Sequence, residues 1–332
     1  MKAVVYRERG PARDVLSIEE LAKPAPAPGE VLVRIEASGA NPSDVKTRNG
    51  NLGPMTDALV VPHSDGAGVI EAVGDGVAAD RIGERVWLYN VNRTADGSGQ
   101  GANGTAAAYC ALPERLVAPL PEAIGFDQGA CLGVPAMTAH RAVFAEGSVK
   151  GKTLLVTGGA GAVGSLAVTM AKWGGARVLS TISSPAKAAV AQGAGADVTI
   201  NYRQENLEDA VLEATNGSGV DRLIDVNFGV HINLTPRILK ANSVIAAYAS
   251  SDAPKPEIDY YPLMFNNTTI RLVFVYAMPA EAKEQAKSDI TALLKDGRLS
   301  PLVAQSFPLE ETAAAHELIE SGKALGNVIC CP

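Results

Sequence analysis

Three glycines at positions 159, 161 and 164 have the spacing G-x-G-x-x-G, which suits a phosphate-binding turn. Gly159 would let the chain turn tightly, Gly161 would let the backbone approach a pyrophosphate, and Gly164 would let the next helix pack on the strand. That helix would begin at Ala162 and Val163 and face the anion with its positive N-terminus. A turn without a ligand is the alternative, since a chain with 33 glycines can produce this spacing by chance. The residues on either side of the glycines must therefore distinguish a phosphate-binding turn from a turn without a ligand.

A strand, a helix and a second strand are expected around these glycines. Residues 153–157 form an apolar, β-rich run, residues 162–173 are apolar at helical spacing, and residues 177–182 suit a strand. This order is the βαβ unit that binds dinucleotides. The context favours a dinucleotide site over an empty turn.

The end of the second expected strand indicates which dinucleotide binds. An NAD site usually has Asp or Glu there, about 20 residues past the glycines, to hold the ribose 2′-hydroxyl. This chain has Ser183, Ser184 and Lys187 instead. Hydroxyl and ammonium groups would hold a 2′-phosphate that a carboxylate would repel, so NADPH is favoured. Helix capping before Pro185, with a solvated lysine, is the alternative and is compatible with phosphate binding.

The composition is that of a globular protein with two domains. The chain has 332 residues, 47% hydrophobic and 20% charged, and no apolar run long enough to cross a bilayer. A net charge of −7 argues against binding to nucleic acid or an anionic membrane. The N-terminus carries charges too early for a signal peptide, so a cytoplasmic location is expected. The four cysteines have no C-x-x-C spacing and are expected to be reduced.

Two regions with different patterns follow one another along the chain. The first is β-rich, and from about residue 126 helices and strands alternate, as in a parallel sheet covered by helices. The closing segment from residue 299 returns to short strands and one helix at 309–321, after a helix at 279–295. Six strands are expected in the alternating region, at 153–157, 178–182, 198–200, 222–225, 244–247 and 270–275.

Several motifs together resemble the medium-chain dehydrogenase/reductases, and within them the zinc-independent quinone oxidoreductases related to ζ-crystallin. They are M-K-A-V at 1–4, P-G-E-V-L-V at 28–33, A-N-P-S-D at 40–44, S-D-G-A-G-V-I-E-A-V-G at 64–74, C-L-G-V-P-A-M-T-A at 131–139, the glycine turn, and I-N-Y-R at 200–203. The resemblance implies an α/β fold with two domains. A GroES-like, β-rich catalytic domain would comprise 1–125 and 278–332. A doubly wound Rossmann domain at 126–277, with a six-stranded parallel sheet, would bind NADPH, and the active site would lie in the cleft.

No metal site is expected. Zinc-containing members of the family have a ligand cysteine where this chain has Asn41, and a G-H-E motif where it has His63, Ser64 and Asp65. Zinc binding needs thiolates, imidazoles or carboxylates in a fixed arrangement. The four histidines are scattered, and packing or surface positions are expected for them, with a substrate or cofactor contact left open for His63.

Without zinc, the chemistry that the chain supports best is hydride transfer from NADPH to an electron-poor acceptor. Asn41, at the metal-ligand position, is the expected catalytic donor to the oxygen that becomes negative. The alternative for Asn41 is an Asn-Pro turn in which the amide caps its own backbone. The substrate pocket is expected to include Asp44, Lys46, Ser64 and Tyr89, with Asp44 fixing the loop.

The resemblance also implies the remaining cofactor contacts. Lys187 and Tyr202 would lie near the 2′-phosphate and Thr138 near the nicotinamide end, and Asn227 is also expected to bind the cofactor. The alternative for Tyr202 is a packing role at the end of its strand. The family often has a basic residue near the C-terminus that completes the phosphate pocket. Here Gly322 aligns best with it, so Lys323 is the candidate.

Three functions remain open at the level of sequence. The first is a metal-free, NADPH-dependent quinone reductase, and the second is a reductase of the double bond in an enone, 2-alkenal or enoyl thioester. The third is an NADPH-binding structural or regulatory protein with negligible turnover. The resemblance further implies a homodimer that pairs through the edge strand of the Rossmann sheet, expected at 270–275.

Overall fold

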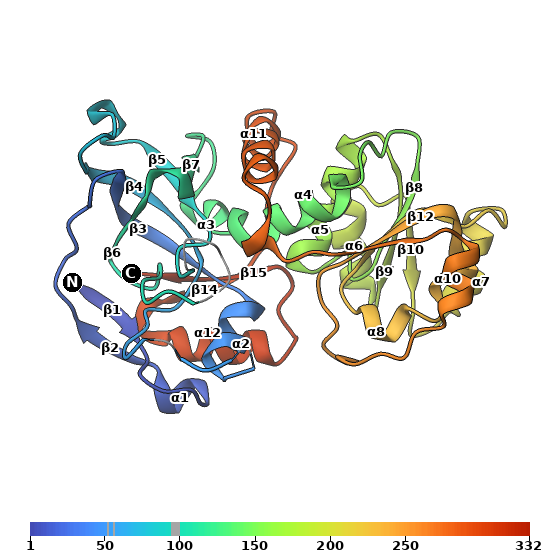
Figure 1. The fold of residues 1–332 in the computed structure, drawn as a ribbon, viewed down its shortest axis with the longest axis horizontal. Helices are drawn as coiled ribbons and strands as arrows, with labels where there is room; N and C mark the ends of the chain where they lie inside the picture. Colours follow the sequence, from blue (N-terminus) through green and yellow to red (C-terminus); the bar gives the residue numbers. More distant parts are fainter. Residues whose placement is uncertain (52, 56, 94–99) are drawn as a thin grey trace. The chain divides into compact units, whose positions relative to one another are not determined.

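The computed structural model describes residues 1–51, 53–55, 57–93 and 100–332 (Figure 1). Contacts divide the chain into two compact units. Unit 1 comprises Met1–Pro135 and Tyr276–Pro332, and unit 2 comprises Ala136–Val275.

Unit 2 is built on a six-stranded parallel sheet with the order β10-β9-β8-β11-β12-β13 (Figure 1). The chain starts in the middle of the sheet, builds outward to β10, and returns to β11 on the other side, which defines a doubly wound fold. The predicted Rossmann fold with six parallel strands is therefore confirmed. The strands are β8 (Thr153–Val156), β9 (Arg177–Ile182), β10 (Val198–Asn201), β11 (Val220–Asp225), β12 (Leu239–Ala247) and β13 (Thr269–Leu272).

The central strands of this sheet are largely buried because a doubly wound sheet is covered on both faces. Leu155, Leu179, Ile200, Leu223 and Ile245 are all buried in one core. The helices of unit 2 are α4 (Met137–Phe144), α5 (Ala162–Trp173), α6 (Pro185–Gly193), α7 (Leu207–Ala214), α8 (Phe228–His231), α9 (Thr235–Ile238) and α10 (Tyr260–Phe265).

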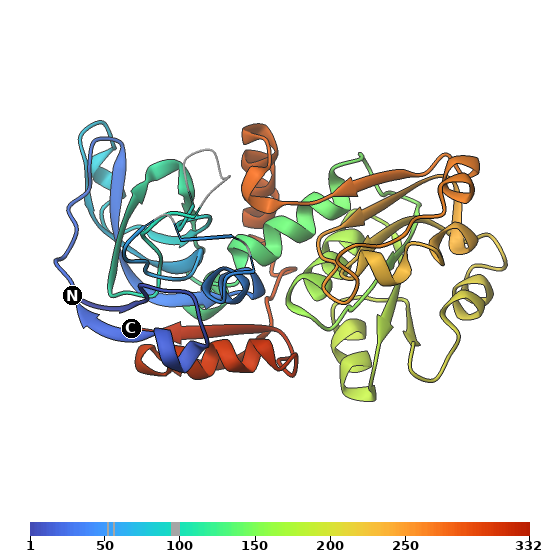
Figure 2. The same ribbon diagram turned by 60° about the horizontal axis from the view of Figure 1, so that its bottom comes forward.

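Unit 1 is β-rich, with a seven-stranded sheet of order β14-β15-β3-β4-β5-β7 in which β6 also pairs with β3. The C-terminal strand β15 runs antiparallel to β3, so both ends of the chain belong to this unit (Figure 2). The strands are β3 (Glu30–Ala40), β4 (Asp65–Val73), β5 (Arg85–Leu88), β6 (Tyr109–Pro113), β7 (Val117–Pro119), β14 (Val303–Pro308) and β15 (Asn327–Cys331), with a separate pair β1 (Lys2–Val5) and β2 (Ser17–Glu20).

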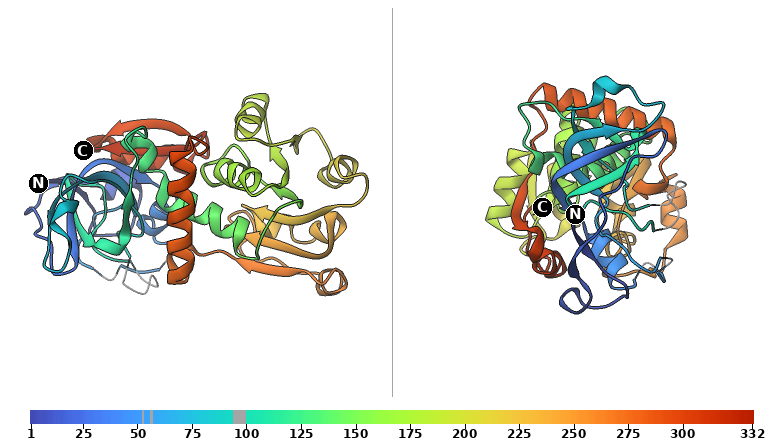
Figure 3. Two further views of the ribbon diagram at one scale, coloured as in Figure 1. Left: turned by 90° about the horizontal axis from the view of Figure 1, so that it is seen from above. Right: turned by 90° about the vertical axis from the view of Figure 1, so that its left-hand side faces the viewer.

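The helices of unit 1 surround these sheets. They are α1 (Ala12–Val15), α2 (Pro42–Arg48), α3 (Phe126–Gly129), α11 (Ala280–Lys295) and α12 (Thr312–Glu320). The expected helix at 279–295 is α11, which is straight (Figure 3). The expected helix at 309–321 begins with a 3-10 turn at Leu309–Glu311 before α12. The expected strand at 270–275 is shorter and ends at Leu272, because Val275–Ala277 forms another 3-10 turn.

Candidate functional site

The glycine turn joins β8 to α5. Its left-handed residue is Gly158, with φ of 68°, rather than Gly159, to which the sequence analysis gave the tight turn. The turn is held by hydrogen bonds from the Gly158 amide to Oγ1 of Thr181, at 2.9 Å, and from the Gly161 amide to the Gly158 carbonyl, at 2.9 Å. A residue with a side chain would be strained at position 158, because only glycine adopts this left-handed conformation readily.

Gly159 and Gly164 are required by close packing. A Cβ atom on Gly159 would lie 1.9 Å from Oγ of Ser180, and one on Gly164 would lie 2.2 Å from the Gly158 carbonyl oxygen. A Cβ atom on Gly161 would have only the Gly158 carbonyl oxygen within 4 Å, at 3.3 Å. The space beside Gly161 is therefore open for a ligand to approach the backbone.

The N-terminus of α5 has no side-chain cap and no acidic residue in its first turn, within the described residues. Ala162, Val163 and Gly164 supply the first backbone amides of this helix. Amides at a helix start lack a partner inside the helix, and the helix dipole adds partial positive charge there. This end of α5 is therefore suited to an anion.

Polar residues gather where β9 and β10 end. Oγ of Ser184 accepts a hydrogen bond from the Lys187 amide at 3.4 Å and so caps α6, as the capping alternative proposed. The Lys187 ammonium group has no ion pair or hydrogen bond among the described residues. Ser183 is half-buried, and Tyr202, half exposed, bonds through its amide to the Ile182 carbonyl at 3.2 Å.

The end of β11 lies at the same edge of the sheet as the glycine turn, because the carboxyl ends of parallel strands share one edge. Asn227 lies there, and its amide nitrogen donates to Oδ2 of Asp252 at 2.7 Å. Thr138 is buried in α4. Lys323 belongs to unit 1 and is exposed, after a left-handed Gly322 whose φ is 65°.

Asn41, the candidate catalytic residue, lies in unit 1 between β3 and α2. Its side chain is buried, and Nδ2 donates to Oδ2 of Asp65 at 2.8 Å. The Asn41 backbone amide donates to Oδ2 of Asp44 at 2.8 Å, which closes the first turn of α2. The donor group of the Asn41 side chain thus bonds to a carboxylate on β4.

Asp65 is fully buried and makes two bonds through one oxygen. Its Oδ2 also accepts from the Val134 amide at 2.7 Å, whereas Oδ1 has no hydrogen-bond partner among the described residues. Burial, and secondarily the nearby charge of Asp44, raise the pKa of Asp65 well above its usual value. This carboxyl group is therefore prone to hold a proton.

Asp44 connects this centre to Ser64. Burial raises the pKa of Asp44 to about 6, against the opposing effect of the Asn41 amide. Oγ of Ser64 lies 3.4 Å from Oδ1 of Asp44 and donates to Oδ1 of Asn92 at 2.5 Å. Tyr276, which the sequence analysis did not identify, has its hydroxyl 2.8 Å from Oγ of Ser43.

His63 and His316 form a buried pair. Their rings stack with centroids 5.2 Å apart, and their Nε2 atoms are 2.9 Å apart. Nδ1 of His63 lies 2.8 Å from Oγ of Ser38. Burial lowers the pKa of His63 to about 3 and that of His316 well below its usual value. His63 is therefore a packed, neutral histidine, in agreement with the packing expectation.

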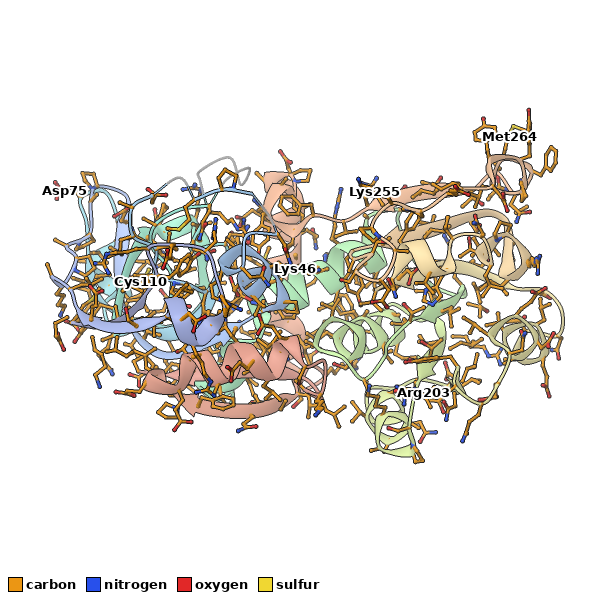
Figure 4. All side chains as sticks on the ribbon, turned by 90° about the horizontal axis from the view of Figure 1, so that it is seen from below. Lys46, Asp75, Cys110, Arg203, Lys255 and Met264 are labelled. Atoms are coloured by element: carbon orange, nitrogen blue, oxygen red, sulfur yellow. The ribbon has the colours of Figure 1, made fainter. Side chains whose placement is uncertain are left out.

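A cavity of about 460 Å³ in unit 1 includes Tyr89, Asn90, Arg93 and Tyr276 among its lining residues. The Tyr89 hydroxyl donates to the Arg115 carbonyl at 2.7 Å, so the ring, rather than a free hydroxyl, is available to a ligand. Lys46 lies on α2 (Figure 4) and does not line this cavity. Arg93 and Tyr276 carry no sequence motif, and only the fold brings them together.

Among the described residues, no group of three or more His, Cys, Asp or Glu side chains is arranged to hold a metal ion. None of the helices in the described ranges is both long and apolar enough to span a membrane.

Comparisons with known proteins agree with this architecture. Residues 27–122 match the alcohol dehydrogenase GroES-like domain, and residues 162–292 match the zinc-binding dehydrogenase domain. The chain is 30% identical to Homo sapiens quinone oxidoreductase, over 99% of this chain and 97% of the relative. It is 38% identical to 2-methylene-furan-3-one reductase of Solanum lycopersicum, over 100% of this chain and 79% of the relative.

A solved structure of Escherichia coli quinone oxidoreductase complexed with NADPH superposes with a TM-score of 0.86 at 25% identity, covering 100% of both chains. The chain belongs to the medium-chain dehydrogenase/reductase family and, within it, to the group that contains the quinone oxidoreductases. It is therefore an oxidoreductase.

Proposed function

We propose that the protein is an NADPH-dependent reductase that transfers hydride to a quinone without a metal ion. Unit 2 is the NADPH-binding domain, and unit 1 is the catalytic domain. The observation that carries the proposal is the glycine turn with an uncapped α5, followed by a lysine rather than a carboxylate beyond β9. Membership of the quinone oxidoreductase group supports the choice of acceptor.

The residues of unit 2 fit NADPH. The open space beside Gly161 and the uncapped start of α5 suit a pyrophosphate. Ser183, Ser184, Lys187 and Tyr202 surround the 2′-phosphate, and the unpaired Lys187 ammonium neutralises its charge. Thr138 contacts the nicotinamide end, Asn227 also binds the cofactor, and Lys323 is the further basic candidate for the 2′-phosphate. When bound, NADPH supplies the hydride.

In unit 1, Asn41 holds the acceptor oxygen. One N–H of its amide bonds to Asp65, which fixes the rotamer, and the other N–H donates to the oxygen that gains negative charge. A positioned donor of this kind lowers the barrier by about 3 kcal/mol. Asp44, Lys46, Ser64 and Tyr89 shape the pocket, with Asp44 also holding the Asn41 loop through the backbone amide.

Reduction of a carbon–carbon double bond in an enone or alkenal is the second candidate. It is favoured by the 38% identity with 2-methylene-furan-3-one reductase. This reaction needs a proton at carbon in addition to the hydride. Asp44 is a suitable source because burial raises its pKa to about 6.

We also propose a homodimer formed through unit 2. Strand β13 is the edge of the six-stranded sheet, and an edge strand offers unpaired backbone groups. Exposed apolar side chains lie on β13 and on α10, including Tyr260, Tyr261, Met264, Phe265 and Leu272, of which Met264 is labelled in Figure 4. Such a patch is typical of a protein interface.

The first experiment measures NADPH oxidation with a para-quinone, an ortho-quinone and a 2-alkenal, repeated with NADH. The proposal predicts quinone-dependent oxidation that is selective for NADPH. Oxidation with the alkenal alone would assign the second candidate instead. Tight NADPH binding without oxidation by any acceptor would refute the reductase and favour a structural or regulatory role.

A further inference from the structure

The cavity of about 460 Å³ in unit 1 lies within the size range of small-ligand sites. Its lining combines apolar residues with three basic side chains, those of Arg93, Arg115 and Lys283. Tyr276, which lines the cavity, connects its wall to the Asn41 loop, since the Tyr276 hydroxyl bonds with Ser43, two residues beyond Asn41. The cavity wall and the proposed reaction centre are therefore joined by one hydrogen bond.

Arg93 is half-buried, and its guanidinium lies over the Tyr276 ring, 3.7 Å from the ring centroid. Two of its donor atoms, Nε and Nη2, are buried and have no hydrogen-bond partner among the described residues. A buried cationic group without a partner is costly, whereas a paired one is not. The Arg93 charge acts on the buried Asp44 and Asp65 and lowers their pKa values against the larger effect of burial, but no hydrogen bond to either carboxyl group engages Nε or Nη2. These two donors thus have capacity for an anionic oxygen group of a ligand.

The acidic residues of the cavity are engaged by other groups. Glu284 pairs with Lys287 at 2.7 Å, and Oε2 of Glu30 accepts from the Ala27 amide at 3.0 Å. Lys283 donates to the Tyr276 carbonyl at 2.9 Å, which holds its ammonium group at the cavity wall. The balance of charge in the cavity is positive.

We propose that this cavity binds an anionic oxygen group of the electron acceptor, a carboxylate or a phosphate, and that Arg93 is the residue that holds it. This proposal rests on the proposed reductase function. It specifies that the electron acceptor carries an acidic group in addition to the part that is reduced. A planar guanidinium suits such a group because it presents paired donors to two oxygens.

The test compares 4-oxopent-2-enoate with its methyl ester, which is the same enone without the charge. Binding is measured by calorimetry in the absence of NADPH, for the unmodified protein, Arg93→Gln, Arg93→Lys and the control Arg298→Gln. Arg298 is exposed, has no partner among the described side chains and does not line the cavity. We expect the acid to bind about 10- to 100-fold more tightly than the ester, a preference that is lost in Arg93→Gln and partly kept in Arg93→Lys.

The proposal is overturned if the unmodified protein binds neither the acid nor crotonyl coenzyme A more tightly than its uncharged counterpart, or if the preference is unchanged in Arg93→Gln. A second pair of ligands distinguishes a carboxylate of the acceptor from a phosphate of its carrier. Crotonyl coenzyme A and the crotonyl thioester of N-acetylcysteamine share the enoyl group, and only the first carries phosphates. An Arg93-dependent preference for crotonyl coenzyme A alone assigns a carrier phosphate, and one for the free acid alone assigns a carboxylate. Because binding is measured without turnover, failure of the reductase assay leaves this result interpretable.

Discussion

Nδ2 of Asn41 lies 2.8 Å from Oδ2 of Asp65, and both side chains are buried. The same carboxylate oxygen accepts from the Val134 amide, so Asp65 is itself fixed in place. The orientation of the Asn41 amide is thus set by a residue on a different strand. This arrangement suits a pre-positioned donor, because a fixed group does not need to reorganise during the reaction.

Replacing Asn41 by Ala removes this donor. We expect kcat to fall about 100-fold or more, because one donor to a developing oxyanion is worth about 3 kcal/mol. The affinity for NADPH should change little, since the proposed cofactor residues lie mainly in unit 2. Steady-state kinetics and a fluorescence titration of NADPH measure the two effects. Unchanged turnover in a folded variant would remove Asn41 from the mechanism.

Replacing Lys187 by Ala tests the recognition of the 2′-phosphate. NADPH should bind about 10-fold more weakly, because a charge-assisted hydrogen bond to the phosphate is lost, while NADH should bind as before. Lys255→Ala is the matched control, since Lys255 is an exposed lysine elsewhere in unit 2. Equal losses of NADPH and NADH affinity in a titration would refute the role of Lys187.

Replacing Gly161 by Ala separates folding from cofactor binding. The added methyl group meets only the Gly158 carbonyl oxygen, at 3.3 Å, so the melting temperature should stay within a few degrees of the original. The methyl group would occupy the space proposed for the pyrophosphate, so NADPH affinity should fall about 10-fold or more. Gly193→Ala, where nothing lies within 4 Å of the new atom, should affect neither quantity. Full NADPH affinity in Gly161→Ala would mean that the turn does not contact the phosphates.

Acidification should reveal opposing contributions to stability from buried acids and histidines, among them Asp44 and His63. The pKa of Asp44 is raised to about 6, so its contribution is present below about pH 4 and is lost as the pH rises through 6. The pKa of His63 is lowered to about 3, so its contribution is present above pH 6.5 and is lost as the pH falls toward 3.

Asp44→Asn removes the first contribution and leaves the second. Its free energy of unfolding should therefore fall more steeply than that of the unmodified protein between pH 6.5 and 4, by up to about 3 kcal/mol. Urea denaturation at several pH values measures this slope. Parallel curves for the two proteins would show that Asp44 titrates normally in the folded state.

Replacing Leu272 by Glu tests the proposed dimer. Leu272 is 72% exposed on the edge strand β13, and a charge there would be buried without a partner on pairing. We expect the unmodified protein to sediment as a dimer and the variant as a monomer. Ile82→Glu, at an exposed apolar residue of unit 1, should remain dimeric. A monomeric unmodified protein would end the dimer proposal.

Local patterns in the sequence were sufficient to predict the sheet of unit 2. The strands around the glycines and the helix at 162–173 depend on contacts between residues close in the chain, and α5 has the expected limits. Gly159 was expected to form the tight turn, but it is required instead by close packing against Ser180. This packing depends on where the next strand lies. Periodicity carries no information about that distance.

Contacts between residues far apart in the chain could not be predicted from the sequence. His63 and His316 are 253 positions apart, and no motif links them. The contact of Arg93 with Tyr276 and the bond of Asn41 to Asp65 likewise depend on the completed sheet of unit 1. The motif around Asn41 marked this residue as a candidate but did not indicate that Asp65 bonds to its side chain.

The pairing of β15 with β3 also affects how the chain folds during synthesis. A ribosome releases β3 nearly 300 residues before β15, so the sheet of unit 1 stays open until the last strand arrives. Unit 2 is continuous in sequence and can fold as soon as residue 275 has left the exit tunnel, since domains generally fold as units. For that interval the nascent chain carries a finished dinucleotide fold beside an unfinished sheet with an exposed edge, a natural binding site for a chaperone.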